Sequence, residues 1–124
     1  NELEVYDFKT GKPQYDWKVR DSRKQITLHE YKRQLTFYKL LIEHSRDYSE
    51  FTVNKGILEF LTPTSRNEIV LLEHNIEQKD VERLKQLIQA VHIRIVNLNY
   101  PDISEFSHDL SGVIEFENWL LEHQ

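Results

Sequence analysis

The residues best suited to carry chemistry lie near the beginning of the chain, in the run Asp7-Phe8-Lys9. Residues 3–9 are rich in β-branched and aromatic types, which predicts a strand. Residues two apart on a strand face the same side, so Asp7 and Lys9 should lie next to each other. Such a carboxylate can hold Mg²⁺ or Mn²⁺, which prefer oxygen ligands, and the lysine can orient the water that the metal activates. Taken alone, however, this pair is more typical of a surface salt bridge.

A second pair, Gln34 and Tyr38, lies on a predicted helix over residues 28–48. Residues four apart on a helix share a face, so the amide and the phenol should point in the same direction. Together they could hydrogen-bond a phosphate or stack against a base. Taken alone, Tyr38 is more typical of a core residue with its hydroxyl at the rim, and Gln34 of a solvated residue.

The elements that must position these residues follow from the hydrophobic pattern. The predicted helix has apolar residues at steps of three and four, which are Leu28, Tyr31, Leu35, Tyr38 and Ile42. Phe37, Leu40 and Leu41 widen its apolar face, so we expect burial on more than one side. Gly56 is interpreted as a bulge within a strand. Further elements are predicted in the order strand, strand, helix, helix, over residues 51–61, 68–73, 78–98 and 113–123. The two strands are joined by a short turn and should be antiparallel. This order indicates an α/β fold, a mixed β-sheet flanked by helices.

Composition limits the class of protein. The chain has 124 residues, 39% hydrophobic and 30% charged, which is typical of one soluble globular domain. No apolar run reaches about 18 residues, so we expect no membrane partner. Cysteine is absent, which excludes an iron–sulfur cluster held by this chain and favours a reducing, cytoplasmic location. The six histidines form no metal-binding pattern and are interpreted as ordinary residues.

Charge is unevenly distributed along the chain. The net charge is −5, which by itself argues against a nucleic-acid partner, yet the first 40 residues contain nine Lys and Arg against six Asp and Glu. A phosphate-binding surface should therefore lie in this first third. The basic residues concerned are Lys18, Arg20, Arg23 and Lys24. A solvated loop and a DNA-contacting loop are equally consistent with them.

The two pairs together carry a more specific signal. The run Asp7-Phe8-Lys9-Thr10-Gly11-Lys12, then a polar loop, then Gln34-Leu35-Thr36-Phe37-Tyr38, resembles the RecB-like branch of the PD-(D/E)XK nuclease superfamily. In that branch a motif around Asp-(Tyr/Phe)-Lys-Thr-Gly-Lys is followed by a helical Gln-x-x-x-Tyr. The resemblance implies a restriction-endonuclease-like fold, of which residues 1–124 would be the C-terminal portion.

The resemblance also implies roles for the matched residues. Asp7 would be a metal ligand, helped by the backbone carbonyl of Phe8, and Lys9 would be the catalytic lysine. Gln34 and Tyr38 would hold the DNA strand or the geometry of the active site, and both count as catalytic residues here. The implied DNA contacts are Lys12, Gln34 and Tyr38.

The resemblance further implies a setting for the domain. Family members carry an earlier His or Glu and an earlier Asp, and the chain begins too close to Asp7 to contain them, so we expect it to be a poor nuclease by itself. The lack of cluster-binding cysteines favours the domain found at the end of RecB-, AddA- or UvrD-like helicases.

We therefore expect part of an Mg²⁺- or Mn²⁺-dependent DNA exonuclease, a hydrolase, joined to an ATP-dependent helicase that acts in DNA repair and recombination. ATP would bind only in the helicase domain, outside this chain. Two alternatives remain. One is a non-catalytic RecB-like domain that binds DNA or braces a helicase complex. The other is an unrelated α/β interaction module in which Asp7 and Lys9 form a salt bridge.

Overall fold

The chain folds into a three-stranded mixed sheet and three helices, as the hydrophobic pattern predicts. The computed structural model describes all of residues 1–124. Its elements are β1 (Glu2–Lys9), α1 (Ser22–Glu43), β2 (Thr52–Phe60), β3 (Val70–Asn75), α2 (Gln78–Val96) and α3 (Leu110–Glu122). The strand order is β1-β2-β3, with β1 parallel and β3 antiparallel to β2. The parallel pair is joined through α1, because parallel strands need a long crossover.

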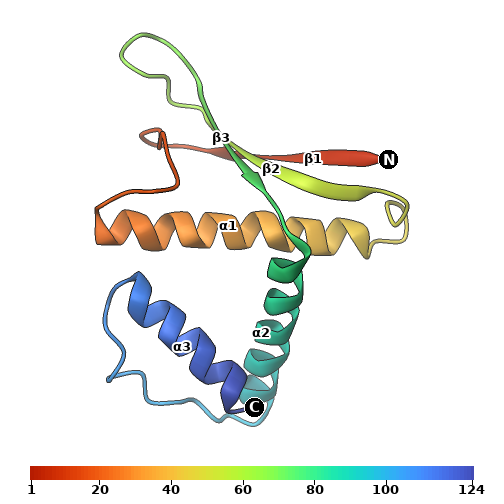
Figure 1. The fold of residues 1–124 in the computed structure, drawn as a ribbon, viewed down its shortest axis with the longest axis vertical. Coiled ribbons are helices and arrows are strands. Elements are labelled where there is room, and N and C mark those ends of the chain that lie inside the picture. The colour runs from red at the N-terminus through yellow and green to blue at the C-terminus, as the bar shows by residue number, and fades with distance from the viewer.

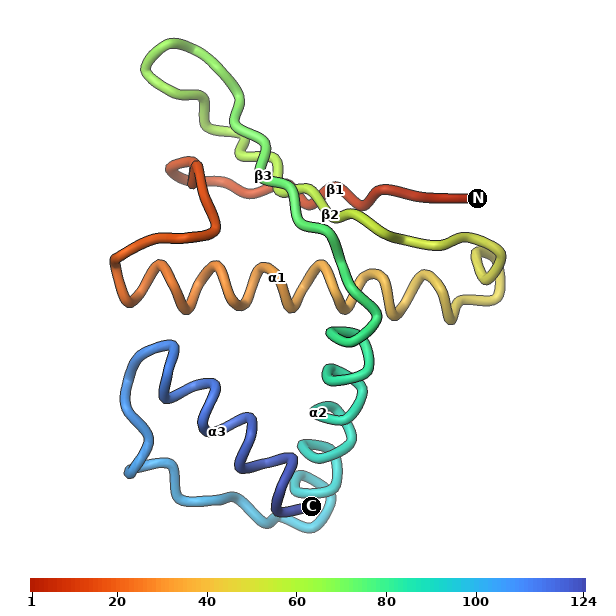
Figure 2. Tube along the Cα trace, viewed as in Figure 1, coloured from red at the N-terminus to blue at the C-terminus, as the bar shows by residue number.

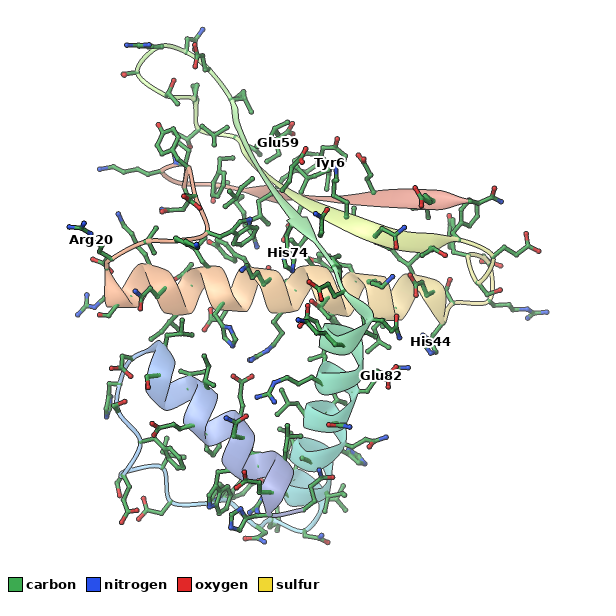
Figure 3. All side chains as sticks on the ribbon, viewed as in Figure 1. Tyr6, Arg20, His44, Glu59, His74 and Glu82 are labelled. Carbon is green, nitrogen blue, oxygen red and sulfur yellow. The ribbon has the colours of Figure 1, made fainter.

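The helix α1 forms the middle layer of the molecule (Figure 1). It runs along one face of the sheet, and α2 and α3 lie on its far side. The other face of the sheet carries Tyr6 and Glu59, which point away from α1 (Figure 3). The main core lies between the sheet and α1, with a contribution from the start of α2. It consists of Leu28, Leu35, Val53, Leu58, Phe60, Leu72, Ile76 and Val81.

Gly56 lets α1 approach the sheet closely. A Cβ atom at this position would lie 2.8 Å from a methyl group of Leu35, a fully buried residue of α1. The interpretation of Gly56 as a bulge is therefore wrong. The irregularity lies two residues earlier in β2. Leu3 of β1 pairs with Val53 and the next residue, Glu4, pairs with Lys55, so Asn54 is the extra residue of the bulge.

The helix α1 begins six residues earlier than predicted, at Ser22. The carboxylate of Asp21 accepts hydrogen bonds from the backbone N–H groups of Arg23 (2.9 Å) and Lys24 (3.0 Å). This side-chain cap satisfies N–H groups that have no partner within the helix. Arg23 and Lys24 are consequently on the first turn of α1, whereas the sequence analysis placed them in a loop. The helix also ends earlier than predicted, at Glu43.

Burial on two sides of α1 is confirmed, but of the three residues predicted to widen its apolar face only Leu40 packs against the core. Phe37 and Leu41 remain 40% and 51% exposed. The side of α1 that meets α2 and α3 presents polar groups instead, among them His29 and Arg33, which contact Glu117 of α3. This second interface is thus built around charged groups.

The helices α2 and α3 complete the layer beneath α1. The first half of α2 is buried through Val81, Leu84 and Leu87, whereas Ile95 near its end and Leu98 beyond it are exposed. The end of the chain lies beside the end of α2 (Figure 2), where Arg94 Nη2 donates a hydrogen bond of 2.9 Å to the carbonyl of His123. None of the three helices combines the length and apolar character needed to cross a membrane.

Candidate active site

The alternation of β1 places Asp7 and Lys9 on the face that meets α1. The carboxylate and the ammonium lie side by side, with Lys9 Nζ 3.0 Å from Asp7 Oδ2, and both side chains are about 15% exposed. Tyr6 and Phe8 point to the opposite face and are largely exposed. The shared face predicted from the two-residue spacing is therefore present, and the pair is much less exposed than a surface salt bridge would be.

The helix α1 supplies two contacts to Lys9. Its ammonium donates a hydrogen bond of 2.6 Å to Gln34 Oε1. The same ammonium lies 4.3 Å from the centre of the Tyr31 ring, within the range of a cation–π interaction. Because Tyr31 and Gln34 are three residues apart on the helix, they reach the strand from the same side. Lys9 is thus held by a carboxylate, an amide and an aromatic ring.

The Asp7 carboxylate has one buried oxygen whose only charged neighbour is the Lys9 ammonium. Its Oδ2 atom is buried and has no hydrogen-bond donor, because the contact with Lys9 lacks hydrogen-bond geometry. A buried carboxylate oxygen without a donor is unusual and suits a hard cation such as Mg²⁺. The chain contains no cluster of three or more His, Asp or Glu side chains placed to hold a metal. Asp7 therefore fits a metal ligand, but the residues present supply only part of a coordination set.

The other predicted site residues lie at different distances from this centre. Tyr38 is half-buried, packs against the core, and lines a cavity of about 290 Å³ that Asp7 also lines. It is therefore both part of the core and beside the metal-ligand candidate. Lys12 is exposed in the loop after β1 and takes part in none of the contacts around Asp7. The structure brings Asp7, Lys9 and Gln34 together most closely.

The sequence analysis missed two features near α1. It assigned Tyr31 only to the apolar stripe, although its spacing of three from Gln34 could have indicated a shared contact. It also read His29 as ordinary, whereas His29 Nε2 lies 3.1 Å from Glu117 Oε2, and Arg33 binds the other oxygen of this carboxylate. Burial opposes ionisation of Glu117, but the hydrogen bond with His29 and the charge of Arg33 outweigh it and hold its pKa below the ordinary value.

Comparison with known proteins identifies the class of this arrangement. The family model of the PD-(D/E)XK nuclease superfamily matches residues 1–106, which include β1, α1 and all of the contacts around Lys9. The chain therefore belongs to the PD-(D/E)XK nuclease superfamily, a class of nucleases that act on DNA and typically use divalent metal ions. No curated protein and no solved structure matches the chain. The helix α3 lies outside the matched residues.

Proposed function

We propose that this chain is the C-terminal portion of a metal-dependent DNA exonuclease domain of the RecB-like branch, with its active site at Asp7 and Lys9. The observation that carries this proposal is the position of the Lys9 ammonium, which lies beside Asp7 and is hydrogen-bonded to Gln34. A lysine held in this position can stabilise the negative charge that develops on a phosphate during the reaction. The combination of Asp-Phe-Lys-Thr-Gly-Lys with Gln-x-x-x-Tyr supports the RecB-like branch.

The residues of this chain would have separate roles in the hydrolysis of DNA. Asp7 would ligate Mg²⁺ or Mn²⁺ through its donor-free oxygen, with the backbone carbonyl of Phe8 as a second ligand. When bound, the ion lowers the pKa of a water molecule and neutralises phosphate charge. Lys9 would donate a hydrogen bond to the attacked phosphate, and Gln34 would fix the position of its ammonium. Tyr38 and Lys12 would contact the DNA strand.

Tyr31 adds a positioning role that follows from its contact with Lys9. Its ring lies 4.3 Å from the ammonium, so it attracts the positive charge of Lys9 and restricts the rotamers of that side chain. Tyr31 would act through Lys9 and would not touch the DNA.

The domain would be part of a larger enzyme. We propose that it is joined to an ATP-dependent helicase of the RecB, AddA or UvrD-like type, which unwinds DNA for repair and recombination. The lack of cysteine supports a cluster-free relative of this kind. ATP would bind in the helicase domain alone.

A second candidate function is a non-catalytic domain of the same superfamily that binds DNA or braces a helicase complex. One observation favours it: no group of three or more His, Asp or Glu side chains in the chain is placed to hold a metal. The close arrangement of Asp7, Lys9 and Gln34 favours the catalytic reading, because a metal-dependent nuclease needs a carboxylate and a positioned lysine side by side.

The test is degradation of linear DNA by the polypeptide that carries this domain, with Mg²⁺ or Mn²⁺ and with or without ATP. Asp7→Asn and Lys9→Gln should each slow degradation by about a hundredfold or more, because each removes a metal ligand or a positioned charge. ATP hydrolysis should continue in both variants. Stimulation of degradation by ATP would support the attached helicase.

The matched controls lie on the exposed face of the same sheet. Glu4→Gln and Lys55→Gln make the same charge changes on the side away from α1 and should leave degradation unchanged. Degradation at the wild-type rate by Asp7→Asn or Lys9→Gln would refute the assignment of the active site. DNA binding without any degradation, with or without metal, would favour the non-catalytic alternative.

A further inference from the structure

A second polar cavity lies on the far side of α1 from Asp7. It has a volume of about 210 Å³ and is lined by residues of α1, the end of β3, α2 and α3. His74, at the end of β3, faces α1 at this cavity (Figure 3). The charged and titratable side chains that line it include Lys32, Arg33, His74, Asp80, Arg83 and Glu117. Eight of its ten lining residues are polar, which indicates a site for a charged ligand.

The cavity has an excess of positive charge. Three permanent cations face two carboxylates there, and Glu117 is already bound by Arg33 and His29. Lys32 and Arg83 form no ion pair anywhere in the chain. Arg83 makes one side-chain hydrogen bond, of 2.8 Å from Nη2 to Asn118 Oδ1. In a chain of net charge −5, two cations without an ion-pair partner in one cavity form a local site for an anion.

A neighbouring cavity extends this site along α1. It has a volume of about 320 Å³, shares His29 and Lys32 with the first, and adds Trp17, Lys18 and Gln25. The Trp17 indole is fixed by a hydrogen bond of 2.6 Å from Nε1 to the carbonyl of Glu73. Lys32 Nζ lies 5.1 Å from the centre of the Trp17 ring. The extension therefore places a rigid aromatic ring next to the cations, a combination that suits a base attached to a phosphate.

We propose that these two cavities form one nucleotide-binding groove, here called the α1–α2 groove. Lys32 and Arg83 would hold a nucleotide phosphate, and the attached base would lie beside Trp17. The ligand is a phosphate ester of a nucleoside, either free or within a single strand. On α1, Tyr31 and Gln34 face Lys9 of β1 while His29 and Lys32 face the groove, so the two sites are separate. The groove needs no metal and does not depend on the proposed nuclease reaction.

The test is a fluorescence titration of the 124-residue chain in the presence of EDTA. Trp119→Phe leaves Trp17 as the only tryptophan. The two probes are thymidine 5′-monophosphate and a short oligothymidylate, which absorb little at the red edge of the indole band. We expect a saturable change in Trp17 emission with at least one probe. Lys32→Gln and Arg83→Gln should each weaken binding about tenfold and, for the oligonucleotide, reduce the salt-dependence slope by about one.

Lys85→Gln is the matched control, because it removes the same charge from α2 outside both cavities. It should leave the affinity within about twofold of the wild-type value. Lys32→Arg should retain binding, which separates loss of charge from loss of fold if Lys32→Gln is unstable. Binding of the oligonucleotide alone would identify a strand, and binding of the monophosphate would identify a free nucleotide. Either result supports the groove.

Two results would overturn the proposal. One is no saturable response of Trp17 to either probe. The other is an equal loss of affinity in Lys85→Gln and Lys32→Gln, which would mean general charge attraction. The groove is tested by Trp17 emission without metal, whereas the nuclease assignment is tested by degradation of DNA with metal, so that failure of one and failure of the other give different outcomes.

Discussion

The environment of Lys9 determines what its ammonium can do. Three different groups converge on it, and Tyr31 is the one that the sequence analysis did not expect in this position. An aromatic ring attracts a cation through its face and does not need the phenolic hydroxyl for this. The contribution of Tyr31 can therefore be separated from ordinary packing.

We predict that Tyr31→Leu lowers the rate constant for DNA degradation by roughly two- to fivefold, the effect expected from losing a cation–π contact. Tyr31→Phe retains the ring face and should restore the wild-type rate. The measurement is kcat and KM for both variants over a range of pH. Equal losses in Tyr31→Phe and Tyr31→Leu would assign the effect to the hydroxyl or to folding.

Tyr38 combines a packing role with a position beside Asp7. Tyr38→Phe keeps the packing and removes only the hydroxyl, so we predict normal thermal unfolding and slower degradation of DNA. Tyr38→Ala also opens a cavity and should destabilise the fold by about 3 kcal/mol, at the lower end for buried aromatic residues because Tyr38 is half-exposed. Wild-type rates for Tyr38→Phe would place Tyr38 in the core alone.

At the scale of elements, the packing of α1 on the sheet depends on the absence of a side chain at Gly56. We predict that Gly56→Ala destabilises the fold by about 1–3 kcal/mol, because its Cβ would meet the fully buried Leu35 at 2.8 Å. Urea denaturation measures the free energy of unfolding. The double variant with Leu35→Ala should lose less than the sum of the two single variants. Strict additivity would mean that the two residues do not compete for the same space.

The types and order of all six elements could be predicted from the sequence, because hydrophobic periodicity is local information. The early start of α1 was missed because its first turns are polar and Asp21 lacks the acidic partner three residues later that completes a capping box. The pair Asp7 and Lys9 could be predicted from strand geometry. The contact between His29 and Glu117 could not, since 88 residues separate them and neither belongs to a local pattern.

For the whole molecule, Glu117 joins α3 to the middle layer. Its pKa is lowered in the folded state, because its contacts with His29 and Arg33 outweigh the effect of burial. Ionised Glu117 therefore stabilises the folded state at pH values above its pKa in the unfolded chain, about 4.3. This stabilisation is lost as the pH falls through the lower pKa that Glu117 has in the folded state. The attachment of α3 should weaken in acid.

We predict that Glu117→Gln lowers the free energy of unfolding at neutral pH by about 1–3 kcal/mol, since it leaves the partly exposed Arg33 without its partner. The variant should also lose less stability than the wild type when the pH is lowered toward 3. Thermal unfolding over this pH range measures both effects. Glu115→Gln, an exposed neighbour on α3, is the control and should match the wild type at neutral pH. Parallel acid profiles for wild type and Glu117→Gln would contradict this account.

The central position of α1 has a mechanical consequence. Lys32 and Gln34 are two residues apart, so they project about 200° apart around one rigid axis. A rotation of α1 by about 5° would move a side-chain end roughly 6 Å from that axis by about 0.5 Å. Such a displacement would lengthen the 2.6 Å hydrogen bond between Gln34 and Lys9 to about 3.1 Å at most, near the long end of the normal range. A ligand that turned α1 at Lys32 would therefore also change the distance between Gln34 and the ammonium on β1.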